Sequence, residues 1–498
     1  MVTKKLEGKL ESENGAKNGN SGNNSVKKKY LITSAQYSYY EDGNGELRKW
    51  GKRGEIACLN ENFYSGLKRF ADETGAEIKI LPIAGCSIKE DIFHSSIEDL
   101  DEIYEWSRRF KKLNENVTLS DILVPPQNVD PATSRKHLPS TYRATLIYPH
   151  SKQRLCPVPS HKSPLPRFLA TTGSITYPNF NRGNDRGDQA WRDHVFGAIL
   201  LDIQDSTYFI MRFLTAQKNG KFVDVGKEYD GNKRPKKIRV EALVLGDYHF
   251  GEHDEDTMNA NYEMIEELSP KKLVIHDFFS GQSISHWQFE KLLSRTQDYR
   301  KGKLDLEKEL EELYFEMNNL SKKISKKGEI YIVHSNHDDF LAKYLEKGMW
   351  RDRDLWNSAF CYNLIGGILK NDTPEDGYLK EALSSFGDIP KKVHFLKLTD
   401  SLAVSGYQLA VHGHIGKNGS KGMSIKGVDE TIGKGVIGHK HAPEQFRNSY
   451  VVGTSSRLDL KFMHGSASAA MGANLAIYGN GSAQMLPIIN GRWKLSEK

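Results

Sequence analysis

The sequence predicts an α/β protein with two α/β regions that follow one another along the chain. Three observations support this prediction: strand and helix patterns alternate after residue 30, short apolar runs recur after residue 240, and the chain has 498 residues. Single domains rarely exceed about 250–300 residues, so the chain has room for two or three. We expect a disordered tail at 1–29, an N-terminal α/β domain at 30–239 and a second domain at 240–498.

The tail at 1–29 is rich in Gly, Asn, Ser and Lys, and a segment with so little to bury is typically disordered. It contains no apolar stretch of the kind that forms a secretory signal. No part of the chain approaches the ~20 apolar residues of a membrane-spanning helix, so we expect no membrane association. The seven Lys and three Glu of the tail give +4 of the formal charge of +6, which leaves +2 for the rest. Overall charge is therefore a weak argument for a nucleic-acid partner.

Cysteine is sparse, and no two cysteines form a CxxC pair. This usage fits a reducing cytoplasm, where disulfides are rare, and it argues against both a disulfide framework and a thiolate zinc site. The cysteines are Cys58, Cys86, Cys156 and Cys361.

Four segments of the N-terminal domain alternate between strand and helix patterns. "KYLITSAQ" (29–36) and "EIKILPIAG" (77–85) predict strands, because β-branched and other apolar residues dominate them. "GEIACLNENFYSGLKRFADETGA" (54–76) and "SIEDLDEIYEWSRRFKKL" (96–113) predict amphipathic helices. This order is typical of an α/β unit. Further strands are expected in "FGAILLDI", "TYFIMRFLTA" and "KFVDVGKEY", before a basic hinge at 232–239.

Between these elements, the segment 131–184 contains no Asp or Glu but eight basic residues. Its prolines predict extended loops rather than helices. Such a segment suits a polyanion, because Lys and Arg contacts to phosphate dominate nucleic-acid affinity and its tyrosines can stack on unpaired bases. A solvated Pro-rich loop is the alternative. The basic residues are Arg135, Lys136, Arg143, Lys152, Arg154, Lys162, Arg167 and Arg182.

The second domain contains five short apolar runs, each followed by Asp, Asn or His. Polar residues at the carboxyl ends of strands gather at one edge of an α/β sheet, so five such ends can converge on one point. Any single cluster has an ordinary explanation as a polar turn, but a turn has no reason to select only these three residue types. The runs end in "GDYH" (246–249), "HD" (276–277), "SNHDD" (335–339), "HGH" (412–414) and "GHKH" (438–441).

Carboxylate and imidazole ligands without cysteine favour a divalent ion such as Mn, Fe or Zn. Two such ions ~3.5–4 Å apart can clamp a phosphodiester and generate a hydroxide at neutral pH for in-line attack. An imidazole with a fixed tautomer can then protonate the leaving oxygen.

The motif order "GDxH … D … NHD … H … GHxH" resembles that of the calcineurin-like metallophosphoesterase superfamily, over about residues 240–460. The resemblance implies a four-layer α/β/β/α sandwich and two divalent metal ions, with Mn first and Fe, Zn or Mg as alternatives. It implies that Asp247, His249 and His441 hold the first metal, and that Asn336, His412 and His439 hold the second. Asp277 would bridge the two. His337 would assist the leaving group as catalytic residue, and Asp338 would orient the His337 ring.

Two positions depart from this family pattern. The family usually has Gly before the bridging Asp and Gly before the Asn of its third motif, whereas this chain has His276 and Ser335. A side chain at either position can crowd the turn or require a different backbone conformation. His276, His253 and His414 are alternative or supporting ligands, and His414 is the main rival to His412.

Three features favour DNA as the substrate. These are the acid-free segment, the Gly- and Lys-rich loop at 416–435, and the ending at 450–493, which resembles phage-type metallophosphoesterases such as the early host-DNA-degrading nucleases of tailed phages. We therefore expect a metal-dependent DNA nuclease in the cytoplasm, that of the host if the chain is phage-encoded. A phosphatase or nucleotide phosphodiesterase on the same site is the first alternative. A non-catalytic, metal-bound scaffold is the second.

A helical insert is expected at 288–327. Within it, the apolar residues of segment 306–324 step by 4, 3, 4, 3 and 4, which is a heptad seam of nearly three repeats. The seam predicts either a helix that lies on its own domain or an intermolecular coiled coil that makes a homo-oligomer.

Overall fold

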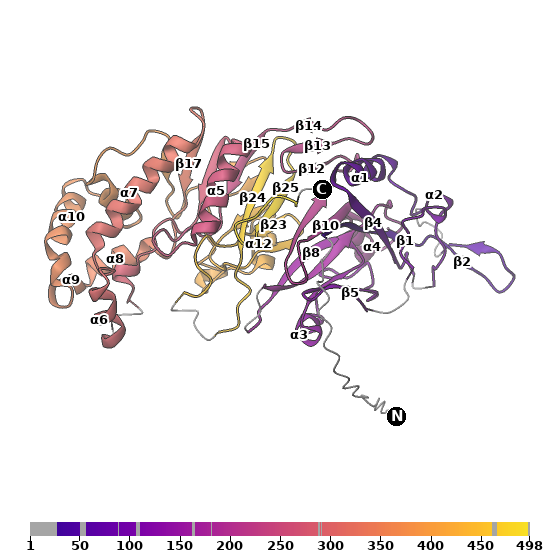
Figure 1. Ribbon diagram of the computed structural model, residues 1–498, viewed down its shortest axis with the longest axis horizontal. Coiled ribbons are helices and arrows are strands. Elements are labelled where there is room, and N and C mark those ends of the chain that lie inside the picture. Colours follow the sequence, from indigo (N-terminus) through magenta and orange to yellow (C-terminus); the bar gives the residue numbers. More distant parts are fainter. Residues whose placement is uncertain are drawn as a thin grey trace, which may run out of the picture.

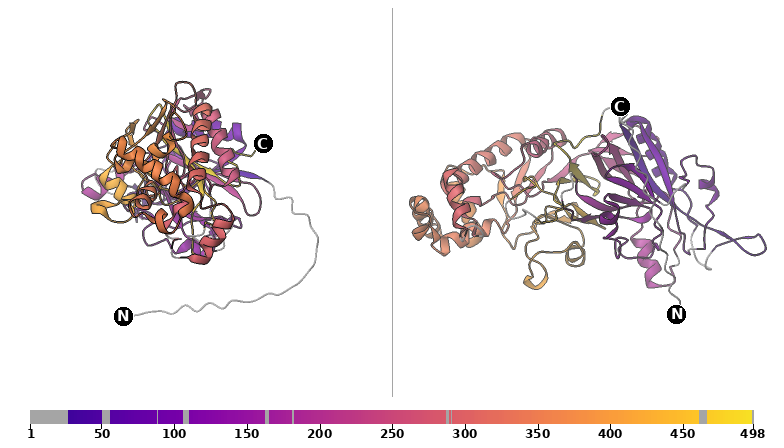
Figure 2. Two further views of the ribbon diagram at one scale, coloured as in Figure 1. Left: turned by 90° about the vertical axis from the view of Figure 1, so that its left-hand side faces the viewer. Right: turned by 60° about the horizontal axis from the view of Figure 1, so that its bottom comes forward.

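The computed structural model describes residues 27–49, 56–87, 89–105, 110–161, 165–180, 182–286, 289, 291–460 and 466–496. Figure 1 shows an elongated mixed α/β molecule, which confirms the predicted α/β class. The N-terminal strands form one end and a helical region from within residues 292–384 forms the other. The right-hand view of Figure 2 shows the same two ends, and in the left-hand view the helical end faces the viewer. The predicted tail lies almost entirely outside the described residues.

An N-terminal four-stranded sheet contains the first predicted elements. Its order is β11 (Phe209–Thr215), β10 (Gly197–Ile203), β1 (Lys28–Gln36) and β4 (Ala76–Ile83). β1 and β4 are parallel and are joined by α1 (Glu61–Thr74), so the predicted strand–helix–strand unit is confirmed. α1 begins where the Asn60 side chain accepts a hydrogen bond from the Phe63 N–H, and it ends at Gly75 in the left-handed conformation.

The helix predicted at 96–113 is wrong. The described part of this segment contains only one helical turn, α2 (Ser95–Glu98), and then β5 (Phe110–Asn114), which pairs antiparallel with β6 (Val117–Ser120). The amphipathic pattern is compatible with a helix, but pairing with a neighbouring strand satisfies the backbone of residues 110–114 instead. Tertiary context has overridden local propensity here.

A ten-stranded sheet crosses the predicted domain boundary at 239–240. Strand β8 (His150–Val158) from the N-terminal part pairs with β22 (Glu444–Phe446) from the C-terminal part, through Arg154 and Leu155. Strands from both sides of the predicted boundary therefore belong to one continuous sheet. The order is β19 (Ala403–Val404), β20 (Tyr407–Gln408), β21 (Gly435–Ile437), β23 (Ser449–Val451), β22 (Glu444–Phe446), β8 (His150–Val158), β9 (Arg167–Gly173), β7 (Thr145–Tyr148), β6 and β5.

The acid-free segment contains the strands β7, β8 and β9, so the prediction of extended loops is wrong for the residues of these strands. Proline is tolerated because Pro149 lies between β7 and β8, where no ladder bond is needed. Pro157 lies within β8, where β9 is paired on one side but the pairing with β22 reaches only Arg154 and Leu155.

A six-stranded sheet contains the first three of the five apolar runs. Four neighbouring strands of this sheet are parallel, and β24 (Gly472–Tyr478) is antiparallel to β15 (Val240–Val244), the last of the four. The order is β18 (Val393–Phe395), β17 (Glu329–Ile332), β16 (Lys272–Ile275), β15 (Val240–Val244), β24 (Gly472–Tyr478) and β25 (Ala483–Ile488). The last two runs form the short strands β20 and β21 of the ten-stranded sheet. All five runs therefore contain a strand.

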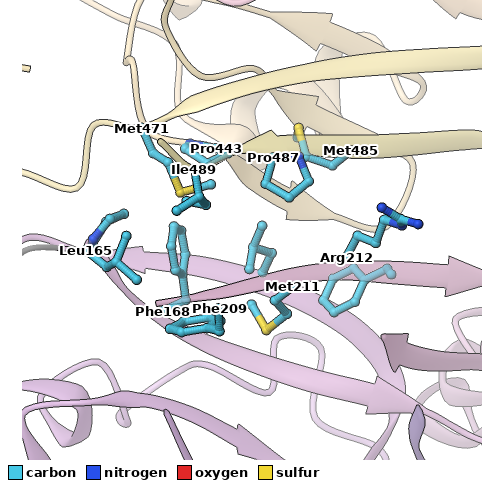
Figure 3. Close-up of a pocket in the computed structure, with 13 residues that line it drawn as sticks. Leu165, Phe168, Phe209, Met211, Arg212, Pro443, Met471, Met485, Pro487 and Ile489 are labelled. Carbon is cyan, nitrogen blue, oxygen red and sulfur yellow. The ribbon is translucent and has the colours of Figure 1, made fainter. Parts of the chain in front are cut away.

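The six-stranded sheet is buried on both faces. Leu243 and Ile275 point to a core shared with α5 (Glu255–Leu268) and α7 (Leu306–Lys323). Ala242 and Val274 point to a second core, which also contains residues of the four- and ten-stranded sheets. This alternation follows from the two-residue period of a strand. A cavity of about 30 Å³ remains in the second core, between Met485 of β25 and Phe168 of β9 (Figure 3).

The heptad seam of α7 belongs to the first core. Leu310, Leu313, Met317 and Leu320 are at most 1% exposed and pack against their own chain. The structure thus favours the prediction of a helix on its own domain. The seam is not available to a second copy, which corrects the alternative of an oligomer built on it.

A helical region follows the third motif and was not anticipated. It contains α8 (Asp338–Glu346), α9 (Met349–Asp352), α10 (Ser358–Lys370) and α11 (Tyr378–Ser384), and it lies with α6 (Leu292–Arg300) beside α7 (Figure 1). The other elements are β2 (Tyr40–Glu41), β3 (Leu47–Arg48), β12 (Phe222–Asp224), β13 (Lys227–Tyr229), β14 (Lys236–Lys237), α3 (Leu138–Tyr142), α4 (Asp185–Arg192), α12 (Ile425–Thr431) and the 3-10 turns Gln282–Ile284, Leu355–Asn357, Glu375–Gly377 and Lys417–Gly419.

Candidate metal centre

The five motifs meet where the six- and ten-stranded sheets adjoin. The first three follow the carboxyl ends of the parallel strands β15, β16 and β17, and the last two follow β20 and β21. The Asp247 N–H donates to the Gly453 carbonyl and so links the end of β15 in one sheet to the end of β23 in the other. The Gly438 N–H donates to the His412 carbonyl and joins the ends of β20 and β21 within the ten-stranded sheet. Residues almost two hundred positions apart therefore share one site, at the edge of the sheet where ligands gather in α/β proteins.

Four of the predicted residues form a first ligand set in which one donor atom of each lies within 4.8 Å of the others: Asp247, His249, Asp277 and His441. His249 Nε2 is 3.0 Å from His441 Nε2 and 3.5 Å from Asp277 Oδ2. His441 Nε2 is 3.4 Å from Asp247 Oδ2. All four residues are buried, so their donor atoms converge on a small enclosed volume.

A second ligand set lies on the other side of Asp277 and contains Asn336, His412 and His439. Asn336 Oδ1 is 3.1 Å from His412 Nε2 and 3.0 Å from His439 Nδ1. His412 Nε2 is also 3.3 Å from Asp277 Oδ2. The same Asp277 oxygen thus lies between the two sets. The structure brings together all seven residues that the sequence singled out as ligands.

Several carboxylate oxygens in this cluster lack a well-formed hydrogen bond from the described residues. These are both oxygens of Asp247, one of which lies 3.4 Å from His441 Nε2, and Oδ1 of Asp277, and all three are buried. An unpaired buried carboxylate is costly, and a bound cation would satisfy it. Two carboxylates, an amide oxygen and four imidazoles also suit a divalent transition metal. The residues fit a metal ion, so the cluster can hold one.

Backbone strain is concentrated at the same place. His249, Asp277, His439 and His441 have φ values of 45°, 45°, 71° and 57°, although none of them is glycine. This left-handed conformation is uncommon for residues with a Cβ and costs on the order of 1 kcal/mol or more for each. Such strain persists where the surrounding structure enforces it, and it accumulates at functional sites.

Glycines in the motifs make the close approach of the strands possible. A Cβ on Gly246 would lie 2.7 Å from the Gly453 carbonyl carbon, and a Cβ on Gly438 would collide with Asp247 Oδ1. Neither contact can be relieved by rotating a flexible side chain, because the first neighbour is backbone and the second is a ligand. The Gly in "GDYH" and the Gly in "GHKH" are therefore required by packing.

Burial keeps most of the imidazoles neutral at pH 7, which is the form that binds metal. It lowers the pKa of His249 well below its ordinary value, and it lowers the pKa of His439 and of His441 to about 4. The nearby Asp277 carboxylate opposes each of these shifts without reversing it.

The pKa values of the two buried carboxyl groups, Asp247 and Asp277, are shifted in opposite directions. Burial and repulsion from Asp277 raise the pKa of Asp247. Burial acts in the same direction on Asp277, but the surrounding imidazoles, His412 first among them, outweigh it and lower its pKa. Burial disfavours the imidazolium of His412, yet the Asp277 carboxylate raises its pKa to about 9. Negative charge is therefore concentrated on Asp277, between the two ligand sets.

His337 borders both sets without belonging to either. Its ring centroid is 4.6 Å from that of His249, and the side chain is partly exposed. Its Nδ1–H donates to the Ser280 carbonyl at 2.6 Å, so Nε2 is the unprotonated nitrogen of the neutral ring. The prediction that Asp338 orients this ring is wrong, because Asp338 Oδ2 accepts from the Ser335 N–H at 2.9 Å and lies 3.7 Å from His334 Nδ1. A backbone carbonyl such as that of Ser280 leaves no signal in a sequence.

The two departures from the family pattern cause no left-handed strain of their own, since neither His276 nor Ser335 has a positive φ. Ser335 Oγ accepts a hydrogen bond from the His337 N–H at 3.2 Å. The His414 ring lies 5.4 Å from the His412 ring between centroids, and neither nitrogen of His414 has a hydrogen-bond partner among the described residues. His253 lies against Phe250 and donates no ring nitrogen to either set.

The predicted nucleic-acid contacts divide into buried and accessible residues. Arg154 is 2% exposed and pairs with Asp130 and Glu444, and Lys152 is 5% exposed, 3.5 Å from Asp193. These two cations stabilise the interior and cannot reach a phosphate backbone, which corrects the prediction. Lys136 and Arg143 are exposed, Arg135 and Arg167 are half-buried, and Lys162 lies outside the described residues.

The comparisons with known proteins give one similarity. The chain is 25% identical over 356 residues to Protein A1 of Escherichia phage T5, a match that covers 68% of this chain and 61% of that protein. The matched region thus spans about three fifths of the phage protein. No protein-family model matches, and no solved structure matches. Among the described helices, none is long and apolar enough to cross a membrane.

Proposed function

We propose that the protein is a two-metal phosphodiesterase that cleaves DNA. The observation that carries this proposal is the pair of ligand sets joined by Asp277 Oδ2, with His337 beside them. A single ion requires only one such set. A shared carboxylate with three further donors on each side fits a dinuclear centre, and the charge on Asp277 would be shared by both cations.

In this proposal, Asp247, His249 and His441 hold one ion, and Asn336, His412 and His439 hold the other. Two such cations, when bound, supply Lewis acidity toward phosphoryl oxygens and a nucleophile from water at neutral pH. Mn is the first candidate, because hard oxygen donors and imidazoles are mixed and no thiolate is present. Fe, Zn and Mg are the alternatives.

The chain's own residues position the substrate and move a proton. The Ser280 carbonyl fixes the His337 tautomer with its proton on Nδ1, so a second proton on Nε2 makes the ring a general acid for the leaving oxygen. Asn336 contributes a neutral oxygen and therefore leaves the centre enough positive charge to attract a phosphodiester. The remaining buried face of the site excludes bulk water.

Exposed lysines beside the site favour a polyanion over a small ester. Lys440 stands between His439 and His441, is exposed, and makes no ion pair with a described residue. Lys421 is likewise exposed and unpaired among the described residues, and the adjacent Gly422 approaches the His439 ring, where a Cβ would lie 4.0 Å from Cδ2. A long nucleic acid would extend beyond the scissile phosphate and reach both lysines, whereas a small ester would not.

The layered arrangement supports the same proposal. Helices α5 and α7 cover one face of the six-stranded sheet, the second core separates this sheet from the ten-stranded sheet, and α12 packs on the far side. We infer the four-layer α/β/β/α sandwich of the metallophosphoesterases from this order. We also propose that residues 30–239 form an N-terminal unit, although they share the ten-stranded sheet with residues 240–498, and that exposed Lys136 and Arg143 of this unit contact DNA.

Incubation with Mn²⁺ and three substrates tests this function. We expect cleavage of plasmid DNA and of a chromogenic phosphodiester, and little release from a chromogenic phosphomonoester. Ester hydrolysis with intact plasmid would replace the nuclease with a phosphatase. No hydrolysis together with full metal binding would favour a scaffold. In the double variant Lys421→Glu, Lys440→Glu, DNA affinity should fall and its salt dependence weaken, while the small diester is cleaved as before.

A further inference from the structure

His276 is a buried imidazole that belongs to neither ligand set. It is 0% exposed, and its Nδ1 lies 3.5 Å from Nδ1 of His412. The two rings are 5.5 Å apart at their centroids and tilted by 36°. Nε2 of His276 has no hydrogen-bond partner among the described residues, so this side chain faces the centre through Nδ1 alone.

The two nitrogens of His412 have different surroundings. Nε2 faces the second ligand set, 3.1 Å from Asn336 Oδ1 and 3.3 Å from Asp277 Oδ2. Nδ1 faces His276, while the nearest carboxylate oxygen, Asp247 Oδ1, is 4.0 Å away. A histidine that binds metal through Nε2 needs its proton on Nδ1, and that N–H is normally donated to an acceptor that fixes the ring.

We propose that His276 is a positioning residue whose Nδ1 accepts the Nδ1–H of His412 and thereby holds His412 Nε2 toward the second ligand set. The inference rests on the proposed function, because it assumes that the second set binds a cation. It also explains the departure from glycine at this position: the imidazole supplies an acceptor where a glycine has none.

The backbone around His276 is arranged to accept its side chain. The His276 carbonyl accepts a hydrogen bond from the Tyr248 N–H at 2.9 Å, which fixes the residue at the end of β16. A Cβ on Gly438 would lie 3.0 Å from the His276 Cβ. Gly438 thus leaves room for the His276 side chain as well as for Asp247.

Calorimetric titration of the metal-free full chain with MnCl₂ tests the inference without any activity measurement. His276→Leu removes the acceptor, and His276→Asn retains an acceptor oxygen near the position of Nδ1. Loss of an orienting partner typically weakens metal binding ~10–100-fold. We expect that loss for one of two ions in His276→Leu and near-normal binding in His276→Asn. His150→Leu is the matched control, because His150 is 1% exposed and its ring nitrogens contact the Pro125 carbonyl and the Lys152 N–H rather than a ligand.

The outcomes separate the inference from the proposed function. A wild-type chain that binds fewer than two ions overturns the proposed function and the inference with it. Two ions in the wild type and unchanged affinities in His276→Leu overturn the inference alone. Should the Leu variant not fold, proton–nitrogen NMR of the Zn²⁺-loaded wild type decides. A His412 ring protonated on Nδ1 supports the inference, and one protonated on Nε2 overturns it.

Discussion

Replacing Asp277 with Asn should abolish the stabilisation that metal gives to the fold. The change is nearly isosteric, but it removes the charge that lies 3.5 Å from His249 Nε2 and 3.3 Å from His412 Nε2. Since the same oxygen faces both ligand sets, we expect both ions to be lost rather than one.

The magnitude follows from linkage between binding and folding. A ligand at one hundred times its dissociation constant stabilises the native state by about 2.7 kcal/mol, so two ions contribute about 5 kcal/mol. Without metal, Asp277→Asn relieves the repulsion that raises the pKa of Asp247, but it also removes the carboxylate whose own pKa the surrounding imidazoles lower. A carboxyl with a lowered pKa stabilises the native state at neutral pH, so the metal-free variant should be less stable than the metal-free wild type.

Thermal unfolding in excess Mn²⁺ and in EDTA, together with metal content after gel filtration, measures both effects. Asp338→Asn is the control, since Asp338 is 8% exposed and close by but belongs to neither set. It should keep the metal-dependent rise in melting temperature. A full metal-dependent rise in Asp277→Asn would refute the shared role of this carboxylate.

Three further predictions concern catalysis, packing and pH. His337→Ala should keep both metal ions in elemental analysis but lose on the order of 10²–10⁴-fold in turnover of the chromogenic diester; equal turnover would remove its role. Leu313→Ala, in the core seam of α7, should cost ~2–5 kcal/mol in unfolding without changing the mass measured by light scattering, and a change in mass would point to an intermolecular seam. Burial lowers the pKa of His150 to about 3, below its unfolded value of 6.5, so the unfolded state binds more protons and stability falls as pH drops below 6.5. Between pH 7 and pH 5, this difference should lower the free energy of unfolding by about 2 kcal/mol. Melting curves of His150→Gln over the same pH range should lack this contribution.

The sequence by itself determined the α/β class and the residues that form the candidate metal centre. Apolar runs of β-branched residues specify strands locally, and Asp, Asn and His at their ends are too selective a set for polar turns. Strands β15, β16 and β17 could be predicted for this reason, and so could the convergence of Asp247, Asp277 and Asn336. The heptad seam of α7 likewise predicted a buried face, though not the partner that covers it.

Tertiary structure alone decided what each predicted side chain contacts. Arg154 and Lys152 looked like cations for phosphate, but pairing across the ten-stranded sheet buries them beside Glu444 and Asp193. The helix expected at 96–113 gave way to β5, because its backbone found a neighbouring strand. The Ser280 carbonyl replaced Asp338 as the partner of His337. In each case the deciding contact joins segments distant in sequence or uses a backbone atom, and a local pattern carries neither kind of information.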